Sequence, residues 1–125
     1  MAVKYFTVEE ANELLAEIEP LMGRLLEIRA KVVIARQEVG TLLDDLHVDV
    51  GAAATSAMVH DFVLIEKLLA QIRAYGCEVK DLNGGLVDFL AKRDGRDIYL
   101  CWRYGEPQIA FYHELHTGFG GRRPL

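Results

Sequence analysis

The sequence predicts an α+β domain, in which a long kinked helical hairpin precedes a small antiparallel sheet of three or four strands. Two periodicities predict this fold. Apolar residues recur every three or four positions over residues 7–46 and 57–75, as in helices, and alternate with polar residues after Cys77, as in strands. A length of 125 residues with 51% hydrophobic content fits one globular domain. We therefore expect a single domain, residues 1–125, with the hairpin over 7–75 and the sheet and a glycine-rich tail over 76–125.

The first helix is expected over residues 7–46. Thr7 is the predicted N-cap, and Glu10, three residues later, completes a capping box. Pro20 removes one backbone donor but leaves the apolar seam in phase, which predicts a kink rather than a break. The seam consists entirely of apolar residues: Ala11, Leu14, Ile18, Leu21, Leu25, Ile28, Val32, Ala35, Val39, Leu42 and Leu46.

A second, shorter helix is expected from about Ala57 to Tyr75, after a connection over His47–Ser56. Gly76 suits the left-handed position that often follows a helix. Because the second helix is shorter, part of the first seam would stay uncovered, which predicts self-association, with a homodimer as the expected assembly. The seam of the second helix is Met58, Phe62, Ile65, Leu69 and Ile72.

Three strands are expected over Leu86–Ala91, Asp97–Arg103 and Gln108–His113, and Cys77–Lys80 is a candidate edge strand. Asp94-Gly95 favours a two-residue hairpin turn between the first two of these three strands. A second turn is expected at Tyr104-Gly105-Glu106-Pro107.

The two turns predict the pairing register. The first pairs Arg93 with Arg96, and the second pairs Arg103 with Gln108. The resulting opposite positions are Phe89 and Leu100, Val87 and Trp102, Trp102 and Ile109, Leu100 and Phe111, and Ile98 and His113. An apolar face that should pack on the helices holds Val87, Phe89, Ala91, Ile98, Leu100, Trp102, Ile109 and Phe111, with His113 at its end. The mixed face holds Leu86, Asp88, Leu90, Tyr99, Cys101, Arg103, Gln108, Ala110 and Tyr112.

Charge and composition exclude several classes of partner. The net charge is −5, and all of it lies in residues 1–75, so this first part of the chain should repel nucleic acid and anionic lipid. No apolar run is long enough for a membrane helix, and the start of the chain does not resemble a signal peptide. We expect a cytoplasmic protein whose two cysteines, Cys77 and Cys101, are reduced thiols.

Several motifs occur together along the chain. Phe6-Thr7-Val8-Glu9-Glu10-Ala11-Asn12 opens it, and the second half contains GLVDF at residues 85–89, LCWRYGEP at 100–107, His113-Glu114, and GFGGRRPL at 118–125. This combination resembles a family of small bacterial and archaeal proteins that is catalogued only as a domain of unknown function. The resemblance covers nearly the whole chain and implies no activity, substrate or catalytic residue. His116 departs from the small or acidic residue that the resemblance leads us to expect.

The first candidate site is a divalent-metal site formed by His113, Glu114 and His116, because imidazole and carboxylate groups are zinc ligands. The two histidines are three residues apart and a glycine-rich stretch follows, so the helical metalloprotease motif does not apply. The alternative is structural: His113 ends a strand, packs on Ile98 and hydrogen bonds through its ring.

The second candidate site binds a small anionic ligand through charged residues near the tail: Asp88, Arg103, Glu106, Arg122 and Arg123. The alternatives are again structural. Asp88 and Arg103 would form a cross-strand salt bridge, Glu106 would be a solvated turn residue, and the two tail arginines would dock on the acidic helices.

Two function classes follow from these features. One is a self-associating interaction or scaffold protein built on the helical hairpin. The alternative is a metal- or small-anion-binding protein, either a simple binder or an enzyme, with its site near His113, Glu114, Glu106 and the Arg122-Arg123 tail. The sequence names neither a substrate nor a protein partner.

Overall fold

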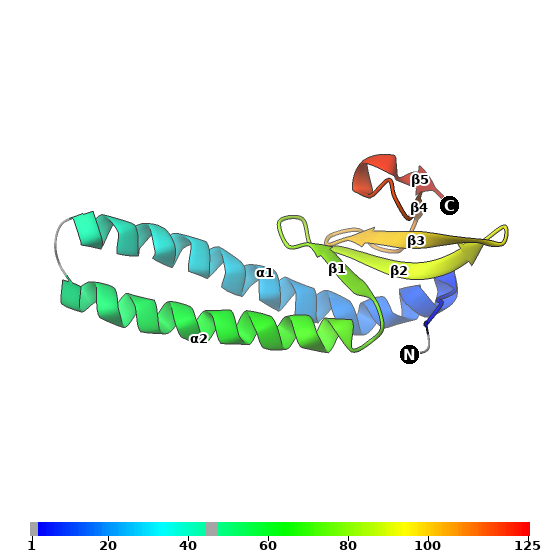
Figure 1. Ribbon diagram of the computed structural model, residues 1–125. Coiled ribbons are helices and arrows are strands. Elements are labelled where there is room, and N and C mark those ends of the chain that lie inside the picture. Colours follow the sequence, from blue (N-terminus) through cyan, green and yellow to red (C-terminus); the bar gives the residue numbers. More distant parts are fainter. Residues whose placement is uncertain (1–2, 45–47) are drawn as a thin grey trace.

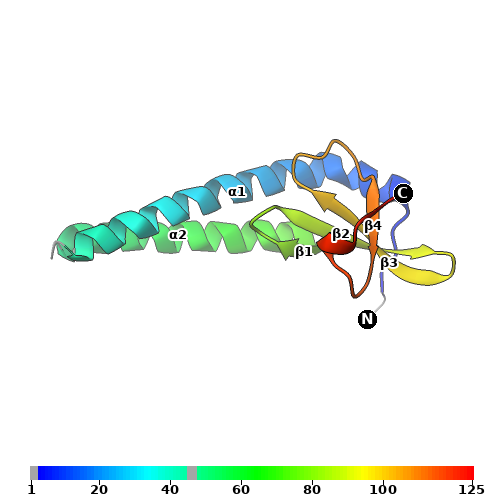
Figure 2. The ribbon, with the colours of Figure 1, turned by 90° about the horizontal axis from the view of Figure 1, so that it is seen from above.

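The computed structural model describes residues 3–44 and 48–125, with the side chains of 3–38 and 56–125. Two long helices run side by side, and an antiparallel sheet packs over one half of this hairpin (Figure 1, Figure 2). The other half extends beyond the sheet. The helices are α1 (Val8–Asp44) and α2 (Val48–Arg73), and the strands, in the order in which they pair, are β1 (Glu78–Asp81), β2 (Leu86–Arg93), β3 (Arg96–Arg103), β4 (Phe111–Glu114) and β5 (Arg123–Pro124). The α+β prediction is confirmed, with five strands instead of three or four.

The start of α1 has the predicted capping box. The Glu10 backbone N–H donates to Thr7 Oγ1, and the Thr7 backbone N–H donates to Glu10 Oε1, both over 3.1 Å. Pro20 lies inside the helix, which continues past it. Every member of the predicted seam between Ala11 and Ala35 is buried or half-buried, while the side chains of Val39, Leu42 and Leu46 lie outside the described residues.

The predicted connection over His47–Ser56 is wrong from Val48 onward, because α2 begins there, and His47 itself lies outside the described residues. The apolar periodicity is lost in this segment, yet the segment is helical, because the run Ala52-Ala53-Ala54 has high helix propensity even without an apolar seam. The two helices therefore run side by side to the far end of the described hairpin (Figure 1). The expectation that part of the α1 seam stays uncovered therefore no longer follows from the lengths of the two helices.

Phe62 was also expected to face α1, but 48% of its surface is exposed. The core-facing stripe of α2 is centred on Ile65, Leu69 and Ile72, with Leu68 beside them, and all four are buried. At about 100° per residue, Phe62 is rotated about 60° from Ile65, which takes it to the edge of that stripe. Val59 and Val63 are exposed near Phe62.

The predicted register between β2 and β3 is confirmed. Arg93 pairs with Arg96, Phe89 with Leu100, and Val87 with Trp102. Asp94 and Gly95 have φ values of 52° and 78°, as a two-residue turn of this kind requires. The single tryptophan, Trp102, is completely buried in the core between sheet and helices.

The predicted register between β3 and β4 is wrong by one residue. Leu100 lies opposite Tyr112, and Tyr99 lies opposite His113. The connection is not the expected four-residue turn but spans residues 104–110. Asn12 Oδ1 accepts the backbone N–H of Ile109 at 2.7 Å, which ties this loop to α1. Since strand faces alternate, the shift puts Tyr112 on the helix side and moves His113 and Phe111 to the outer side.

The outer face of the sheet is covered by the end of the chain. Strand β5 pairs with β4, and the short 3-10 helix η1 (Phe119–Gly121) precedes it. This cover explains why Asp88, Cys101 and His113 are all buried although they face away from the helices. Neither helix, over the residues described, is long and apolar enough to cross a membrane.

Candidate functional site

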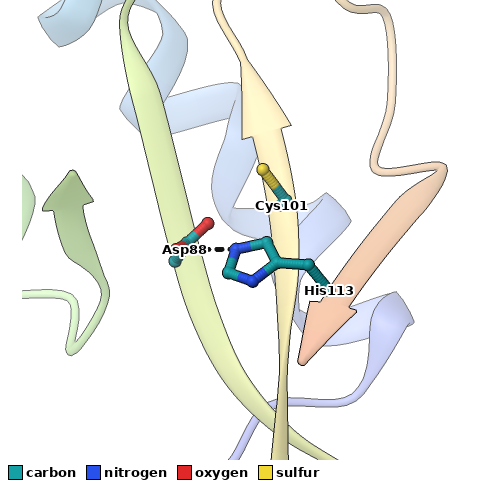
Figure 3. Close-up of side chains that lie close together, drawn as sticks. All are labelled: Asp88, Cys101 and His113. Atoms are coloured by element: carbon teal, nitrogen blue, oxygen red, sulfur yellow. Dashed lines mark hydrogen bonds and ion pairs between the residues drawn. The ribbon is translucent and has the colours of Figure 1, made fainter. Parts of the chain in front are cut away.

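Three chemically active side chains meet beneath the C-terminal segment. Asp88 comes from β2, Cys101 from β3 and His113 from β4 (Figure 3). Asp88 and Cys101 are direct cross-strand partners, and His113 is opposite Tyr99, two residues from Cys101 on the same face. One ligand atom from each of the three residues lies within 4.8 Å of the other two. Each residue is at most 3% exposed.

The closest contact in this cluster joins the imidazole and the carboxylate. His113 Nε2 lies 3.0 Å from Asp88 Oδ2, and both side chains are 3% exposed. His113 Nδ1 lies 2.7 Å from the backbone oxygen of Glu114. A carbonyl oxygen only accepts, so Nδ1 must carry a proton. The bond to the backbone therefore fixes the tautomer and aims Nε2 at Asp88.

With Nδ1 protonated, a neutral imidazole presents an unprotonated Nε2 to the carboxylate. A hydrogen bond at 3.0 Å then needs a second proton, carried either by His113 Nε2 or by Asp88. Burial raises the pKa of Asp88, and this outweighs the opposing effect of the neighbouring His113. The hydrogen bond between the two side chains therefore requires one shared proton.

One carboxylate oxygen of Asp88 does not take part in the contact with His113. Its Oδ1 is buried and has no hydrogen-bond partner among the described residues. A buried carboxylate oxygen without a donor is rare in folded proteins, because it loses its hydration without compensation. The Cys101 thiol interacts with this carboxyl group, and Asp88 lines a pocket that has room for a further positive or hydrogen-bonding group.

Cys101 supplies the third donor. Its burial, followed by the negative charge of Asp88, raises the pKa of the thiol to about 12. Both ring nitrogens of His113 already have partners, so His113 has no free nitrogen to deprotonate Cys101. The arrangement is therefore not a cysteine–histidine nucleophile pair, which needs an activated thiolate.

Arg122 fastens the covering segment next to Cys101. Its guanidinium forms a two-pronged ion pair with Glu106, at 2.6 and 3.0 Å, and donates to the Cys101 backbone oxygen at 3.0 Å. The same group lies 4.3 Å from the ring centre of Phe111 and 4.7 Å from that of Phe119. Planar guanidinium groups suit both kinds of contact.

A pocket of about 110 Å³ adjoins the cluster. It reaches Asp88, Cys101 and His113, and its rim includes Lys80, Leu115 and Phe119, which are exposed. Since one water needs only about 10–15 Å³ of such space, the pocket has room for several waters or a small ligand. The buried cluster is thus open to solvent on one side.

The structure brings together only some of the predicted site residues. Glu106 and Arg122 are paired, so Arg122 docks on the turn and not on the acidic helices. Asp88 pairs with His113 rather than Arg103, which lies 5.9 Å from the Phe119 ring centre. Arg123 is exposed in β5.

The structure also does not bring together the three residues of the predicted metal site, His113, Glu114 and His116. His113 is in the cluster, but the Glu114 carboxylate faces Arg96 at 3.1 Å, and His116 is exposed in the following turn. The packing of His113 on Ile98 was expected from the register that proved wrong.

Sequence reasoning missed Cys101 as a partner of His113. One signal was available: Leu100, Cys101 and Trp102 are consecutive apolar residues, which predicts a strand buried on both faces. A covered outer face would have turned attention to the polar residues of that face.

One protein-family model matches this chain, over residues 4–125, and its description is "Uncharacterized conserved protein (DUF2203)". No curated protein and no solved structure matches it.

Proposed function

This chain belongs to the uncharacterised conserved protein family DUF2203, and we propose that it binds a divalent metal ion of the zinc class through Asp88, Cys101 and His113. The observation that carries the proposal is the orientation of His113. Its Nδ1 donates to the Glu114 carbonyl, and its Nε2 points at a buried carboxylate that has an unsatisfied oxygen. Histidines that bind metals have such a second-shell acceptor on the other ring nitrogen.

The three donors select the kind of metal. Thiolate, imidazole and carboxylate together suit Zn²⁺ and its close relatives, whereas Mg²⁺ and Ca²⁺ prefer oxygen ligands alone. Ligand atoms around a tetrahedral Zn²⁺ lie about 3–4 Å apart, and the donors here already lie within 4.8 Å. Small side-chain shifts would bring them onto one ion.

A metal ion would also resolve the electrostatic problem of the site. It would replace the proton shared by Asp88 and His113, and it would neutralise the Cys101 thiolate, which burial disfavours in the free protein. Three protein ligands leave a fourth position for water or substrate, as in catalytic zinc sites. The adjoining pocket is where that position would open.

A thiolate ligand requires a reduced cysteine. Cys101 and Cys77 are both free and buried. This requirement agrees with the cytoplasmic location that we propose from the sequence, since thiols stay reduced there.

The test is metal titration of the purified full chain after removal of metals with a chelator. Co²⁺ serves as the probe, because its thiolate complexes absorb in the near ultraviolet and its tetrahedral complexes absorb in the visible. We expect one ion per chain and both kinds of absorption. His113→Gln and Cys101→Ala should each weaken Co²⁺ binding at least tenfold. Cys101→Ala should remove the near-ultraviolet thiolate band, and His113→Gln should remove the visible bands of the tetrahedral complex.

Two matched variants serve as controls. His116→Gln removes an exposed histidine three residues away, and Cys77→Ala removes the other buried thiol. Both should bind Co²⁺ like the unmodified chain. Absence of binding, or binding lost in His116→Gln and kept in His113→Gln, would contradict the assignment.

A second candidate function is self-association through the helical hairpin. It is supported by three large apolar side chains that are exposed on α2: Val59, Phe62 and Val63. Exposed apolar surface of this kind favours an interaction between proteins. Sedimentation equilibrium should give about 28 kDa, twice the chain mass of 14.0 kDa.

A further inference from the structure

We propose that two copies of the chain meet through the outer face of α2, packed antiparallel about a two-fold axis between Glu66 and Lys67. This inference rests on the self-association proposed above and adds the surface and the geometry. Its starting point is a shallow groove on α2 that is lined by six residues of one helix: Val59, Phe62, Val63, Glu66, Lys67 and Ala70.

The groove is apolar and exposed. Val59 is 56% exposed, and Phe62 and Val63 are each 48% exposed. These side chains are separate from the core stripe of α2, which Ile65, Leu69 and Ile72 form. The helix therefore has two apolar stripes, and among the side chains that the structure describes only one of them packs in the core.

The spacing along the groove is that of a helix–helix seam. Val59, Val63, Glu66 and Ala70 follow one another at intervals of four, three and four residues. Residues spaced in this way remain on one side of a helix and can interlock with a partner helix. An occupant with a matching helical seam is thus favoured over a flat surface or an extended peptide.

The charge distribution favours a second copy on α2 rather than on α1. Over residues 56–73, α2 has two acidic and two basic residues, Asp61, Glu66, Lys67 and Arg73, and is neutral. Over residues 8–38, α1 has seven acidic and four basic residues, and the whole chain has a net charge of −5. Two identical chains would repel one another through α1, but not through the outer face of α2.

A two-fold axis makes the two faces complementary. In an antiparallel pair centred between residues 66 and 67, Glu66 lies opposite Lys67 of the second copy, and this contact occurs twice. In the same register, Val63 lies opposite Ala70 of the second copy. The small alanine leaves space at that position for the neighbouring Phe62.

The experiment measures dimerisation by sedimentation equilibrium of the full chain. We expect Phe62→Glu to raise the dissociation constant of the dimer at least tenfold. The matched control is Ile34→Glu, which adds the same charge at an exposed apolar position on α1. It should leave the dimer within threefold of the unmodified chain.

Charge reversal tests the register independently of packing. Glu66→Lys alone and Lys67→Glu alone should each weaken the dimer, because like charges would then face each other. The double variant with both changes should recover most of the affinity. These exposed positions are not in the core, and circular dichroism checks that each variant is folded.

The outcomes separate the two levels of the proposal. A monomer at 100 μM unmodified chain overturns self-association itself. A dimer that survives Phe62→Glu but dissociates in Ile34→Glu overturns only the α2 surface. A dimer that Phe62→Glu weakens without rescue by the double charge reversal overturns the antiparallel register.

Discussion

Asp88 and His113 belong to strands that do not pair with each other, yet their side chains meet at 3.0 Å across β3. His113 reaches diagonally over the central strand, past Cys101, to the carboxylate on β2 (Figure 3). Both groups are polar, buried and dependent on each other. Such a pair costs stability unless it is complete, so it is expected to act as a unit.

We predict that the two residues are strongly coupled in the metal-free protein. Asp88→Ala and His113→Ala should each lower the free energy of unfolding by about 3–5 kcal/mol, because each leaves the other group buried without its partner. The double variant should cost less than the sum, by about 1–3 kcal/mol. Urea unfolding in the presence of a chelator measures all three. Strict additivity would show that the two side chains do not interact.

The two thiols should be unreactive in the folded protein. Burial raises the pKa of Cys77 to about 11 and that of Cys101 to about 12, so almost no thiolate is present at pH 8. A thiol-specific colour reagent should therefore react with neither cysteine in native buffer and with both in guanidinium chloride. Rapid reaction of one thiol in the folded state would mean that this thiol is not buried as the structure has it.

The sequence predicted the fold where local signals decide it. The capping box at Thr7 and Glu10, the turn at Asp94-Gly95 and the register of Val87 opposite Trp102 are all determined by residues close together in the chain. The same reasoning failed for β4. A hydrogen bond from the Ile109 backbone to Asn12, 97 residues away, holds the loop before that strand.

The candidate site could be predicted only in part for the same reason. Asp88 opposite Cys101 follows from one hairpin, and the sequence placed these two correctly. His113 joins them only because the preceding loop shifts β4 by one residue. Phe119 and Arg122 cover the site through contacts between segments of the chain, and the pattern of apolar residues does not predict such contacts.

Two glycines should differ sharply in their tolerance of alanine. Gly85 has φ of 65°, and a Cβ there would lie 2.8 Å from Tyr104 Cβ and 3.3 Å from Met22 Cγ. Gly95 has φ of 78° but nothing within 4 Å of such a Cβ. Gly95→Ala should cost about 1–2 kcal/mol from backbone strain alone. Gly85→Ala should cost clearly more, because the chain must also move. Thermal unfolding compares them, and equal losses would contradict the close approach of Gly85 to Tyr104.

The Glu106–Arg122 ion pair should make the covering segment sensitive to acid. Burial opposes ionisation of Glu106, but the bonds from Arg122 and from the Arg103 backbone N–H outweigh it, so the pKa of Glu106 falls below its ordinary value of 4.5. A lowered pKa in the folded state adds stability that is present above pH 4.5 and is lost as the pH falls through the folded value. Glu106→Gln should therefore lower the free energy of unfolding at pH 7 by about 1–3 kcal/mol, as for other hydrogen bonds to charged groups.

The pH dependence of that loss is the sharper test. As the pH falls below 4.5 and through the lowered pKa of Glu106, the unmodified chain protonates this group and loses the same interaction, so the melting temperatures of the two proteins should converge. Glu114→Gln is the matched control, since Glu114 pairs with the more exposed Arg96 and should change the melting temperature at pH 7 far less. A difference between Glu106→Gln and the unmodified chain that stays constant from pH 7 to pH 3 would mean that the charge of Glu106 does not hold Arg122 in place.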